Sequence, residues 1–384
     1  MKINIFGSTG NIGVKSLDLI HNHFPEIKVN LLCAKNNIQL LKKQIKIYKP
    51  NYVYIENNLQ YNKLKKNIRK KTVILDFIEL KKYLKETKSS YTILSISGYK
   101  SLNFLSYIIG NTKILGLVSK EAIVSAGHLL NKINSDNNTN IYPLDSEHFS
   151  IYNFLNSNKF NFDIKKLYLT ASGGPFLGKN FFDLSEVSVL EACKHPKWEM
   201  GYKNSIDSAT LANKCLELVE AHYLFNISYK KLDIVIHPES LIHSIFEYKN
   251  FISQFIYFYN DMKIPIYNFL NHNFNYDKNI FKKFDFKKKL NLNFTDVKKN
   301  EFPIYYLFKK LDKSSPRNII KFNFANEYAV NLFKKKEISY PDIYKVINKI
   351  LSFNLNYQVN TIKDIINYHE NLEIYAKEKK FRLI

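Results

Sequence analysis

Near its start the chain reads Ile3-Asn4-Ile5-Phe6-Gly7-Ser8-Thr9-Gly10-Asn11-Ile12-Gly13, an apolar run followed directly by three evenly spaced glycines. Glycine is scarce elsewhere: the chain has 11 in 384 residues, whereas average usage of about 7% would give more than twice as many. Where a first strand turns into a first helix, glycines let the pyrophosphate of a dinucleotide approach the bare backbone. The GxxGxxG spacing is also compatible with a plain turn, but its position after a terminal strand favours a nucleotide-binding unit.

The pattern that follows predicts a parallel sheet. Short apolar runs alternate with longer amphipathic stretches up to about residue 145, and this alternation is typical of a doubly wound, Rossmann-like α/β fold. The predicted strands are Ile3–Phe6, Val29–Cys33, Tyr52–Ile55, Val73–Leu75, Thr92–Ile96 and Ile114–Val118. We expect a loop at 134–140 and, near the C-terminus, helices at 326–335 and 340–351.

The end of the second predicted strand indicates which dinucleotide would bind. An Asp or Glu at that point contacts the ribose of NAD. Here the chain reads Cys33-Ala34-Lys35-Asn36-Asn37, with a cation in place of the acid. Because a cation favours a 2′-phosphate, the sequence predicts NADP(H).

Composition and charge exclude other classes of protein. Lys and Arg number 57 against 34 Asp and Glu, for a formal net charge of +23. The lysines are scattered along the whole chain, so we interpret them as solvated faces that attract phosphorylated ligands, not as a nucleic-acid site. No apolar stretch of about 18 residues is present, so no membrane partner is expected.

The unpaired spacing of Cys33, Cys193 and Cys215 disfavours disulfides and zinc and favours a reducing compartment. Because Met1 runs directly into the first predicted strand, we expect the bacterial cytoplasm over a plastid-type organelle.

Two carboxylates follow the predicted loop. Asp145 and Glu147 are two residues apart, so in an extended backbone both side chains point to one side. Like charges so placed repel unless a cation lies between them, and oxygen ligands suit Mg²⁺ or Mn²⁺. A solvated sheet edge is the alternative interpretation.

A third carboxylate lies in the segment 208–217, which is predicted to be a helix that begins at Ser208 as its N-cap. Lys214 and Asn213 share one helical face with Glu217, and the helix start is a ready anion site. A surface ladder of salt bridges is the alternative.

Two further segments are rich in ligand-binding residue types. In Leu169–Phe176 a hydroxyl, Ser172, stands beside Gly173 and Gly174, which allows close backbone approach to a phosphate. The segment His195–Gly201 contains the single Trp of the chain, Trp198. We interpret it as a flap that closes over a ligand, with a core tryptophan as the alternative.

Together these motifs resemble the 1-deoxy-D-xylulose-5-phosphate reductoisomerase family. The matching segments are collinear and span nearly the whole chain: 7–13, 120–122, 145–148, 169–176, 195–201, 207–217, 237–240, 261–265 and 325–330. The resemblance implies an oxidoreductase of non-mevalonate isoprenoid biosynthesis. Its reaction is the NADPH- and divalent-metal-dependent rearrangement and reduction of 1-deoxy-D-xylulose 5-phosphate to 2-C-methyl-D-erythritol 4-phosphate.

The resemblance also implies a domain organisation and a homodimer. We expect an NADPH-binding domain at 1–141, a central α+β catalytic and dimerisation domain with the flap at 142–271, a connecting segment at 272–301, and a C-terminal helical bundle at 302–384.

Residue roles follow from the same resemblance. Asp145, Glu147 and Glu217 would hold Mg²⁺ or Mn²⁺, with Co²⁺ a further candidate, and Lys120 joins them as a catalytic residue. The phosphorylated sugar would be bound by Ser146, Ser172, His195, Trp198, Met200, Ser208, Asn213 and Lys214. NADPH would contact Gly7, Ser8, Thr9, Gly10, Asn11, Ile12, Lys35, Asn36, Ser119, Glu121 and Gly201.

The chain departs from the family pattern at several positions. Ser119 stands where Asn is usual, and Tyr99-Lys100-Ser101 replaces Ala-Ala-Gly, so we expect weakened cofactor affinity. The other departures are Ala34, Leu177, Glu239 and Lys263.

Two alternative functions remain: another NADP-dependent oxidoreductase, which needs no three-carboxylate metal site, and a basic nucleic-acid-binding protein, whose binding would be steeply salt dependent.

Overall fold

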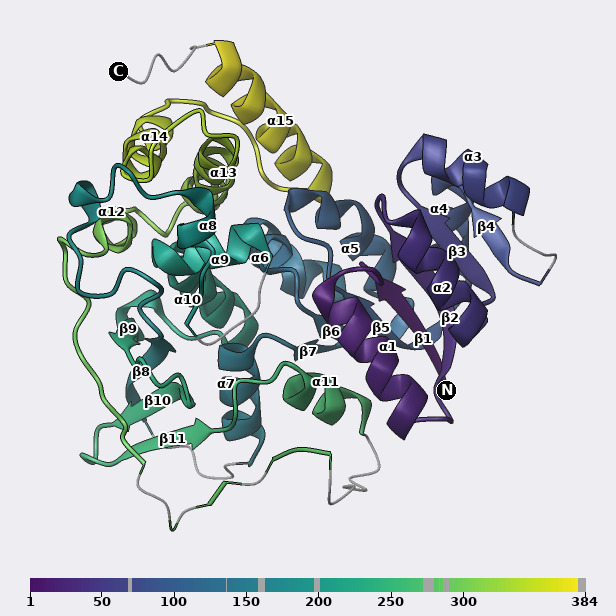
Figure 1. Ribbon diagram of the computed structural model, residues 1–384, viewed down its shortest axis with the longest axis horizontal. Coiled ribbons are helices and arrows are strands. Elements are labelled where there is room, and N and C mark those ends of the chain that lie inside the picture. Colours follow the sequence, from purple (N-terminus) through teal and green to yellow (C-terminus); the bar gives the residue numbers. More distant parts are fainter. Residues whose placement is uncertain are drawn as a thin grey trace. The chain divides into compact units, whose positions relative to one another are not determined.

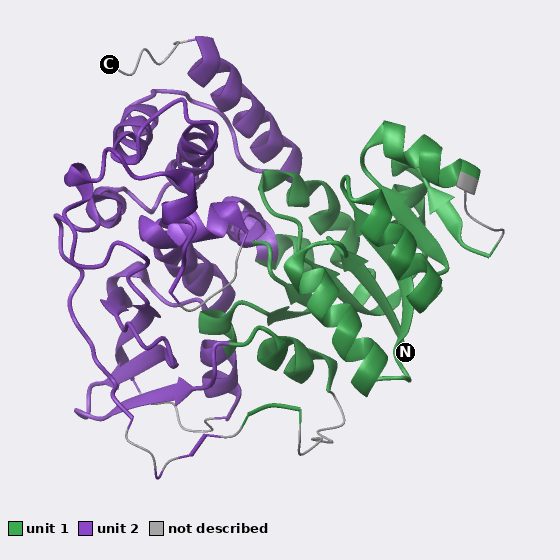
Figure 2. Cartoon of the chain, viewed as in Figure 1, with its two compact units in different colours: residues 1–119, 131–149, 261–282 green, residues 120–130, 150–260, 283–384 purple. Residues whose placement is uncertain are grey.

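The computed structural model divides the chain into two compact units (Figures 1 and 2). Unit 1 comprises residues 1–119, 131–149 and 261–282, and unit 2 comprises 120–130, 150–260 and 283–384. The structure describes residues 1–67, 71–135, 137–157, 163–196, 201–271, 280–282, 284–285, 287 and 290–378. The four-part division at 141, 271 and 301 stays a prediction.

Unit 1 contains a parallel sheet that has seven strands among the described residues, in the order β4-β3-β2-β1-β5-β6-β7. The chain moves outward from β1 to β4 and then returns to β5 on the other side of β1, which is the doubly wound topology that the alternation predicted. The strands are β1 (Lys2–Phe6), β2 (Lys28–Ala34), β3 (Tyr52–Ile55), β4 (Val73–Leu75), β5 (Ser89–Leu94), β6 (Thr112–Leu117) and β7 (Asn140–Pro143).

The strands of unit 1 are mainly apolar on both faces. In β1, Ile3, Ile5 and Phe6 are fully buried, as expected for a parallel sheet covered by helices on both sides. The strand β7 was missed, because it has four residues and overlaps the loop expected at 134–140. Its Pro143 is tolerated because β7 lies at the edge of the sheet.

Helices complete unit 1. Helices α1 and α11 pack side by side, with the rings of Phe24 and Tyr267 5.3 Å apart. The helices are α1 (Asn11–His23), α2 (Ile38–Tyr48), α3 (Asn58–Asn67), α4 (Phe77–Glu86), η1 (Tyr99–Ser101), α5 (Leu102–Ile108) and α11 (Lys263–Leu270). Two more, α6 (Lys120–Asn134) and α7 (Ser146–Ser157), contain residues of both units.

Unit 2 contains a mixed sheet in the order β11-β10-β8-β9. Strands β8 (Ile164–Ala171) and β9 (Leu232–Ile236) are parallel, while β10 (Ile242–Tyr248) is antiparallel to β8 and to β11 (Ser253–Tyr257). The core includes Phe154 of α7 stacked on Phe246 of β10, with ring centroids 3.8 Å apart.

The rest of unit 2 is mainly helical. The helices predicted at 326–335 and 340–351 are confirmed, because they overlap α13 and α14 with ends that differ by at most two residues, although α13 begins ten residues earlier. The elements are α8 (Val189–Ala192), α9 (Tyr202–Ala209), α10 (Ala212–Phe225), α12 (Pro303–Lys310), α13 (Pro316–Lys334), α14 (Asp342–Leu351), α15 (Ile362–Glu378), and the short η2 (Phe181–Asp183) and η3 (Tyr229–Lys231). The α/β fold class is confirmed.

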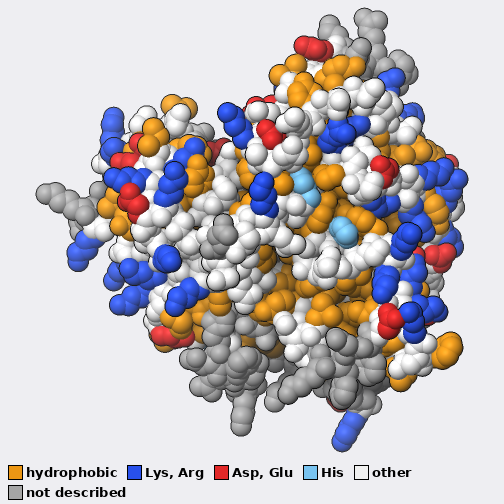
Figure 3. Space-filling view, turned by 180° about the vertical axis from the view of Figure 1, so that it is seen from behind, with side chains coloured by type: hydrophobic (Ala, Val, Ile, Leu, Met, Phe, Trp, Pro, Cys, Tyr) orange, Lys and Arg blue, Asp and Glu red, His pale blue; other side chains and the backbone are white. Residues whose placement is uncertain are grey.

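Basic side chains occur at many separate places on the visible surface. Figure 3 shows Lys and Arg side chains spread over the visible face, with uncharged and hydrophobic side chains between them. In the part of the chain that the structure describes, no helix is both long and apolar enough to cross a membrane.

Candidate active site

The glycine loop of unit 1 connects β1 to α1. Gly7 has φ +85°, and a Cβ there would lie 2.6 Å from the carbonyl oxygen of Ser95. A Cβ on Gly13 would lie 2.4 Å from the carbonyl oxygen of Gly7. The helix begins after Gly10 with no side-chain cap. The glycines are therefore required for a tight turn and a close helix, and the uncapped helix start is the feature that an anionic pyrophosphate needs.

The other cofactor residues predicted in unit 1 lie at the carboxyl ends of its strands. Lys35 and Asn36 follow β2 directly and are exposed. Ser119 is buried after β6, and its hydroxyl donates to the carbonyl oxygen of Ile96 at 2.6 Å. The carboxyl ends of parallel strands at a reversal of strand order are where such folds bind ligands.

Asp145 and Glu147 form a carboxylate pair where β7 meets α7. The expected extended backbone is wrong: Asp145 precedes the helix, Glu147 lies in its first turn, and the Glu147 N–H donates to Asp145 Oδ1 at 3.3 Å. Helix capping by Asp145 therefore replaces strand alternation. A carboxylate oxygen of Asp145 nevertheless lies within 4.8 Å of one of Glu147.

Two neighbours orient this pair. The Ser146 hydroxyl donates to Glu147 Oε2 at 2.6 Å, and His148 Nδ1 lies 3.2 Å from Asp145 Oδ1. His148 is fully buried. Because its ring is held by packing, it fixes the Asp145 carboxylate, a role that the sequence reasoning did not assign.

The helix start predicted at Ser208 is wrong. Ser208 lies near the end of α9, and α10 begins at Ala212 after Leu211, whose φ of 63° breaks the helix. Leucine rarely adopts this left-handed conformation, so nothing local in the sequence marks the break. Asn213 and Lys214 do lie in the first turn of α10, as the anion-site interpretation requires.

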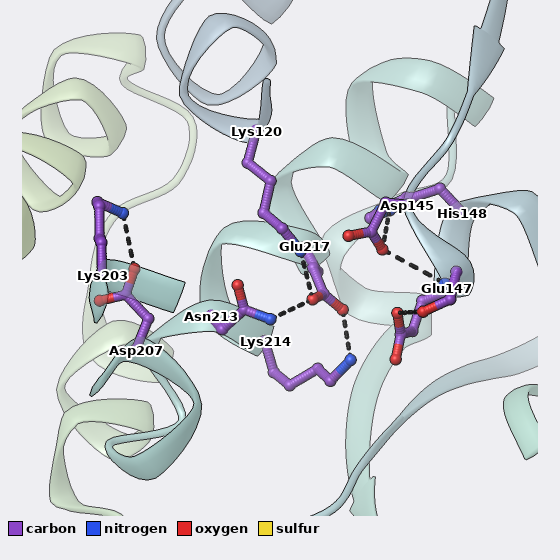
Figure 4. Close-up of polar contacts among 10 residues, drawn as sticks. Lys120, Asp145, Glu147, His148, Lys203, Asp207, Asn213, Lys214 and Glu217 are labelled. Atoms are coloured by element: carbon purple, nitrogen blue, oxygen red, sulfur yellow. Dashed lines mark hydrogen bonds and ion pairs between the residues drawn. The ribbon is translucent and has the colours of Figure 1, made fainter. Parts of the chain in front are cut away.

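Glu217 of α10 receives three donors (Figure 4). Lys120 Nζ, from the first residue of α6, lies 2.6 Å from Oε1, and Lys214 Nζ lies 2.7 Å from Oε2. Asn213 Nδ2 also donates to Oε1. Glu217 is 1% exposed, so the alternative of a surface ladder is wrong. A carboxylate so buried requires cationic partners.

The loop after β8 brings Ser172 to the end of α9. Ser172 Oγ lies 2.9 Å from His195 Nε2. Gly173 and Gly174 have φ of +83° and +67°, and a Cβ on Gly174 would lie 2.9 Å from Ala209 Cα and 3.2 Å from the Ser208 carbonyl oxygen. Glycine there allows the loop to pack against the end of α9, where Ser208 lies.

The structure describes the predicted flap segment, 195–201, only in part. Trp198 and Met200 lie outside the described residues, and Gly201 is the exposed residue before α9. Glu121, predicted to contact the cofactor, is 5% exposed, and its Oε1 lies 3.1 Å from Lys203 Nζ. Sequence reasoning missed Lys203, although its spacing of four residues from Asp207 is a helix ion-pair signal.

Comparison with known proteins gives family matches over most of the chain. The family model of 1-deoxy-D-xylulose 5-phosphate reductoisomerase matches residues 3–127. That of the 1-deoxy-D-xylulose 5-phosphate reductoisomerase C-terminal domain matches 141–225, and that of the DXP reductoisomerase C-terminal domain matches 259–374.

Individual relatives extend over the full length. The chain is 35% identical to 1-deoxy-D-xylulose 5-phosphate reductoisomerase of Clostridium acetobutylicum, with 98% of both chains covered. It is 37% identical to the enzyme of Wolbachia sp. subsp. Drosophila simulans (strain wRi), covering 95% of this chain and 94% of that one. The crystal structure of DOX-P reductoisomerase in complex with NADPH, fosmidomycin and magnesium matches with a TM-score of 0.91 and 28% identity, over 99% of this chain and 98% of that one. This chain is thus a member of the 1-deoxy-D-xylulose 5-phosphate reductoisomerase family.

Proposed function

We propose that the chain catalyses the NADPH- and divalent-metal-dependent conversion of 1-deoxy-D-xylulose 5-phosphate to 2-C-methyl-D-erythritol 4-phosphate. The observation that carries this is the match to reductoisomerases over 98% of the chain. A related enzyme is known in complex with NADPH, fosmidomycin and magnesium, so NADPH and Mg²⁺ are the cofactors of this chain, with Mn²⁺ as a substitute.

Asp145, Glu147 and Glu217 are the proposed metal ligands. Their fit to Mg²⁺ rests on the donor set, since all are carboxylate oxygens, the ligands that hard cations prefer. The 4.8 Å limit between oxygens of Asp145 and Glu147 suits two ligands of one ion. A divalent cation held by these carboxylates would polarise the substrate carbonyl, and bound NADPH would supply the hydride. His148 and Ser146 hold the first two carboxylates in place.

Lys120 acts beside Glu217 in unit 2. Its ammonium pairs with the carboxylate of Glu217. This contact holds the ammonium where it can reach the oxygen atoms of a substrate bound beside Glu217. As a catalytic residue it donates hydrogen bonds to oxygens that gain negative charge during the rearrangement.

The substrate phosphate is the proposed ligand of the Ser172 loop and the first turn of α10. Ser172 and Ser208 supply hydroxyls, Asn213 an amide and Lys214 a cation, and phosphate prefers a helix N-terminus. Holding the phosphate away from the reacting carbons orients them. His195, Trp198 and Met200 are the proposed flap, which excludes water.

NADPH is the proposed ligand of the glycine loop and of the strand ends around it. The residues are Gly7 to Ile12, Lys35, Asn36, Ser119, Glu121 and Gly201. The tight turn at Gly7 and the uncapped start of α1 support the pyrophosphate contact.

The test is metal-dependent oxidation of NADPH by purified protein with deoxyxylulose phosphate, followed by cofactor absorbance. Glu217→Gln is expected to abolish turnover while NADPH binding survives. The matched control is Glu373→Gln, because Glu373 is also paired with a lysine, at 2.6 Å, but is exposed on α15; it should keep wild-type turnover. Absence of metal-dependent oxidation in the wild type rejects the function, and wild-type turnover in Glu217→Gln removes Glu217 from the metal site.

A homodimer is part of the proposal. Strand β11 is an edge strand of the sheet in unit 2, and edge strands with exposed apolar side chains invite pairing. Phe255 of β11 is 46% exposed, and Phe251 and Ile252, just before the strand, are 96% and 54% exposed. Sedimentation equilibrium should give twice the chain mass, and Phe251→Ser with Phe255→Lys should shift the protein toward the chain mass. A wild type that sediments as a single chain would contradict the dimer. The bacterial sources of the relatives support a bacterial cytoplasmic location.

A further inference from the structure

The ammonium of Lys203, in unit 2, lies among carboxylates from different helices. Lys203 Nζ of α9 lies 2.7 Å from Asp207 Oδ2 on the same helix and 3.1 Å from Glu121 Oε1 of α6. The side chains of Asp207 and Glu121 are 1% and 6% exposed, and that of Lys203 is 20% exposed. Ion pairs at this depth are costly to break, because either partner alone is an uncompensated buried charge.

Helix α13 completes the cluster. Asn326 Nδ2 donates to Asp207 Oδ1 at 2.8 Å. The next residue, Glu327, has a buried Oε2 with no hydrogen-bond partner among the described residues. Burial raises the pKa of Glu327 to about 7; Lys203 opposes this shift, and the charges of Glu121 and Asp207 add to it. One lysine thus compensates carboxylates of three helices.

Lys203 stays charged in this environment. Burial by itself lowers the pKa of its ammonium, but the carboxylates of Asp207, Glu121 and Glu327 outweigh burial and raise it. Without that cation the carboxylates would repel one another, and α6, α9 and α13 would have no ionic link at this point.

The partners of Lys203 are direct neighbours of residues in the proposed machinery. Glu121 follows Lys120, whose ammonium lies on Glu217. Asp207 precedes Ser208, a proposed phosphate ligand next to the Gly174 loop. A shift of α6 against α9 would therefore move Lys120 and Ser208 relative to each other.

We propose that Lys203 is a positioning residue of this enzyme. Its ammonium joins the start of α6 to α9 through Glu121 and Asp207, and so sets the spacing between the Lys120 ammonium and the phosphate site at Ser208. This inference rests on the proposed function.

The test compares Lys203→Met with wild type. Methionine keeps the length of the side chain and removes the charge. The matched control is Lys377→Met, because Lys377 forms an ion pair of the same spacing with Glu373 at 2.6 Å, but its side chain is 64% exposed on α15. Turnover is divided by the number of sites that bind NADPH, so that unfolded protein does not count.

We expect Lys203→Met to lower kcat/KM for deoxyxylulose phosphate at least tenfold, since small misplacements of reacting groups have effects of this size. A lower kcat would indicate a displaced Lys120 ammonium, and a higher KM would indicate a displaced phosphate site at Ser208. Lys203→Arg, which keeps the cation, should recover most of the loss, and Lys377→Met should match the wild type. In a Lys120→Met background the effect of Lys203→Met on kcat should shrink to under threefold, because the route through Lys120 is gone.

Other outcomes overturn the inference. A folded Lys203→Met with wild-type kcat and KM would do so, as would an undiminished effect in the Lys120→Met background. If Lys203→Met does not fold, Asp207→Asn decides, because it keeps shape and removes one charge; wild-type kinetics in that variant reject the role. If the wild type itself shows no metal-dependent turnover, the proposed function fails first and the positioning role fails with it.

Discussion

Lys120 Nζ lies 2.6 Å from Glu217 Oε1, although 97 positions separate the two residues in the chain. The contact joins the first residue of α6 to the middle of α10 within unit 2. It gives the buried carboxylate of Glu217 a cation. A divalent ion bound at Glu217, a proposed metal ligand, would therefore compete with the Lys120 ammonium for the same oxygen atoms.

This competition predicts the effect of Lys120→Met on metal binding. Removing a positive charge a few ångströms from a cation site lowers the repulsion, so the affinity of the free enzyme for Mn²⁺ should rise several-fold while turnover falls at least tenfold. Titration calorimetry without substrate measures the affinity. Lys345→Met is the control, because the Lys345 side chain is 59% exposed on α14, and it should change neither value. Unchanged or weaker Mn²⁺ binding in Lys120→Met would show that Lys120 and the ion do not share Glu217.

The position of Lys35 leads us to expect a preference for NADPH over NADH. This lysine is exposed directly after β2, where a cation would contact a 2′-phosphate. Lys35→Ala should raise KM for NADPH about tenfold, consistent with the loss of a charge-assisted hydrogen bond of about 1.5 kcal/mol, and should leave KM for NADH within about twofold. The exposed Lys28, at the start of the same strand, provides the control variant Lys28→Ala. Equal effects on both dinucleotides would argue against a 2′-phosphate contact.

The burial of His369 leads us to expect that the free energy of unfolding depends on pH. This histidine is fully buried on α15, with Nε2 3.1 Å from Ser125 Oγ, and burial lowers its pKa to about 3. The unfolded chain takes up the proton near pH 6.5, so the stabilisation is complete above that pH and is lost as pH falls toward 3. Between about pH 7.5 and 5.5 this histidine should remove about 1.4 kcal/mol of unfolding free energy.

Urea unfolding at both pH values measures this loss. His369→Gln cannot titrate and should show a pH difference smaller by that amount. Other buried groups, such as Glu327, are present in both proteins and cancel in the comparison. An identical pH dependence in wild type and variant would contradict the buried neutral histidine.

At Gly127, α6 packs so closely against Tyr223 of α10 that no larger side chain fits. A Cβ there would lie 2.1 Å from Cδ2 and 2.4 Å from Cγ of Tyr223, too close for the ring to avoid by a small rotation. Gly127→Ala should destabilise the protein by about 1–3 kcal/mol, seen as a lower Tm. Gly201→Ala is the control, because no atom of the described residues lies within 4 Å of its Cβ position. A Tm equal to that of the control would mean that the helices separate without cost.

Much of unit 1 could be predicted from local patterns. The strands from β1 to β6 were predicted with their ends within three residues, because buried parallel strands are short continuous apolar runs between turns. The glycine loop was also predicted, since steric limits at Gly7 and Gly13 act over a few residues. Edge strand β7 was not, because it has only four residues, overlaps the loop expected at 134–140 and ends in Pro143.

The site was predicted less completely. Asn213, Lys214 and Glu217 were correctly assigned to one helical face, which the period of a helix dictates. The break at Leu211 was missed, and with it the place of Ser208 in α9. The left-handed conformation of a leucine has no local signal and persists only where surrounding packing enforces it.

The amino-acid order alone determined the residue types of the site, the nucleotide loop and the family, because these depend on spacings of a few residues or on collinear motifs. Tertiary structure alone decided which charges meet: Lys120 with Glu217, and Lys203 with Glu121. Neither pair is close in the chain, and their attraction counts only after folding removes water from around them. Local rules extend about one helical turn, whereas burial and charge compensation depend on every segment that packs around a side chain.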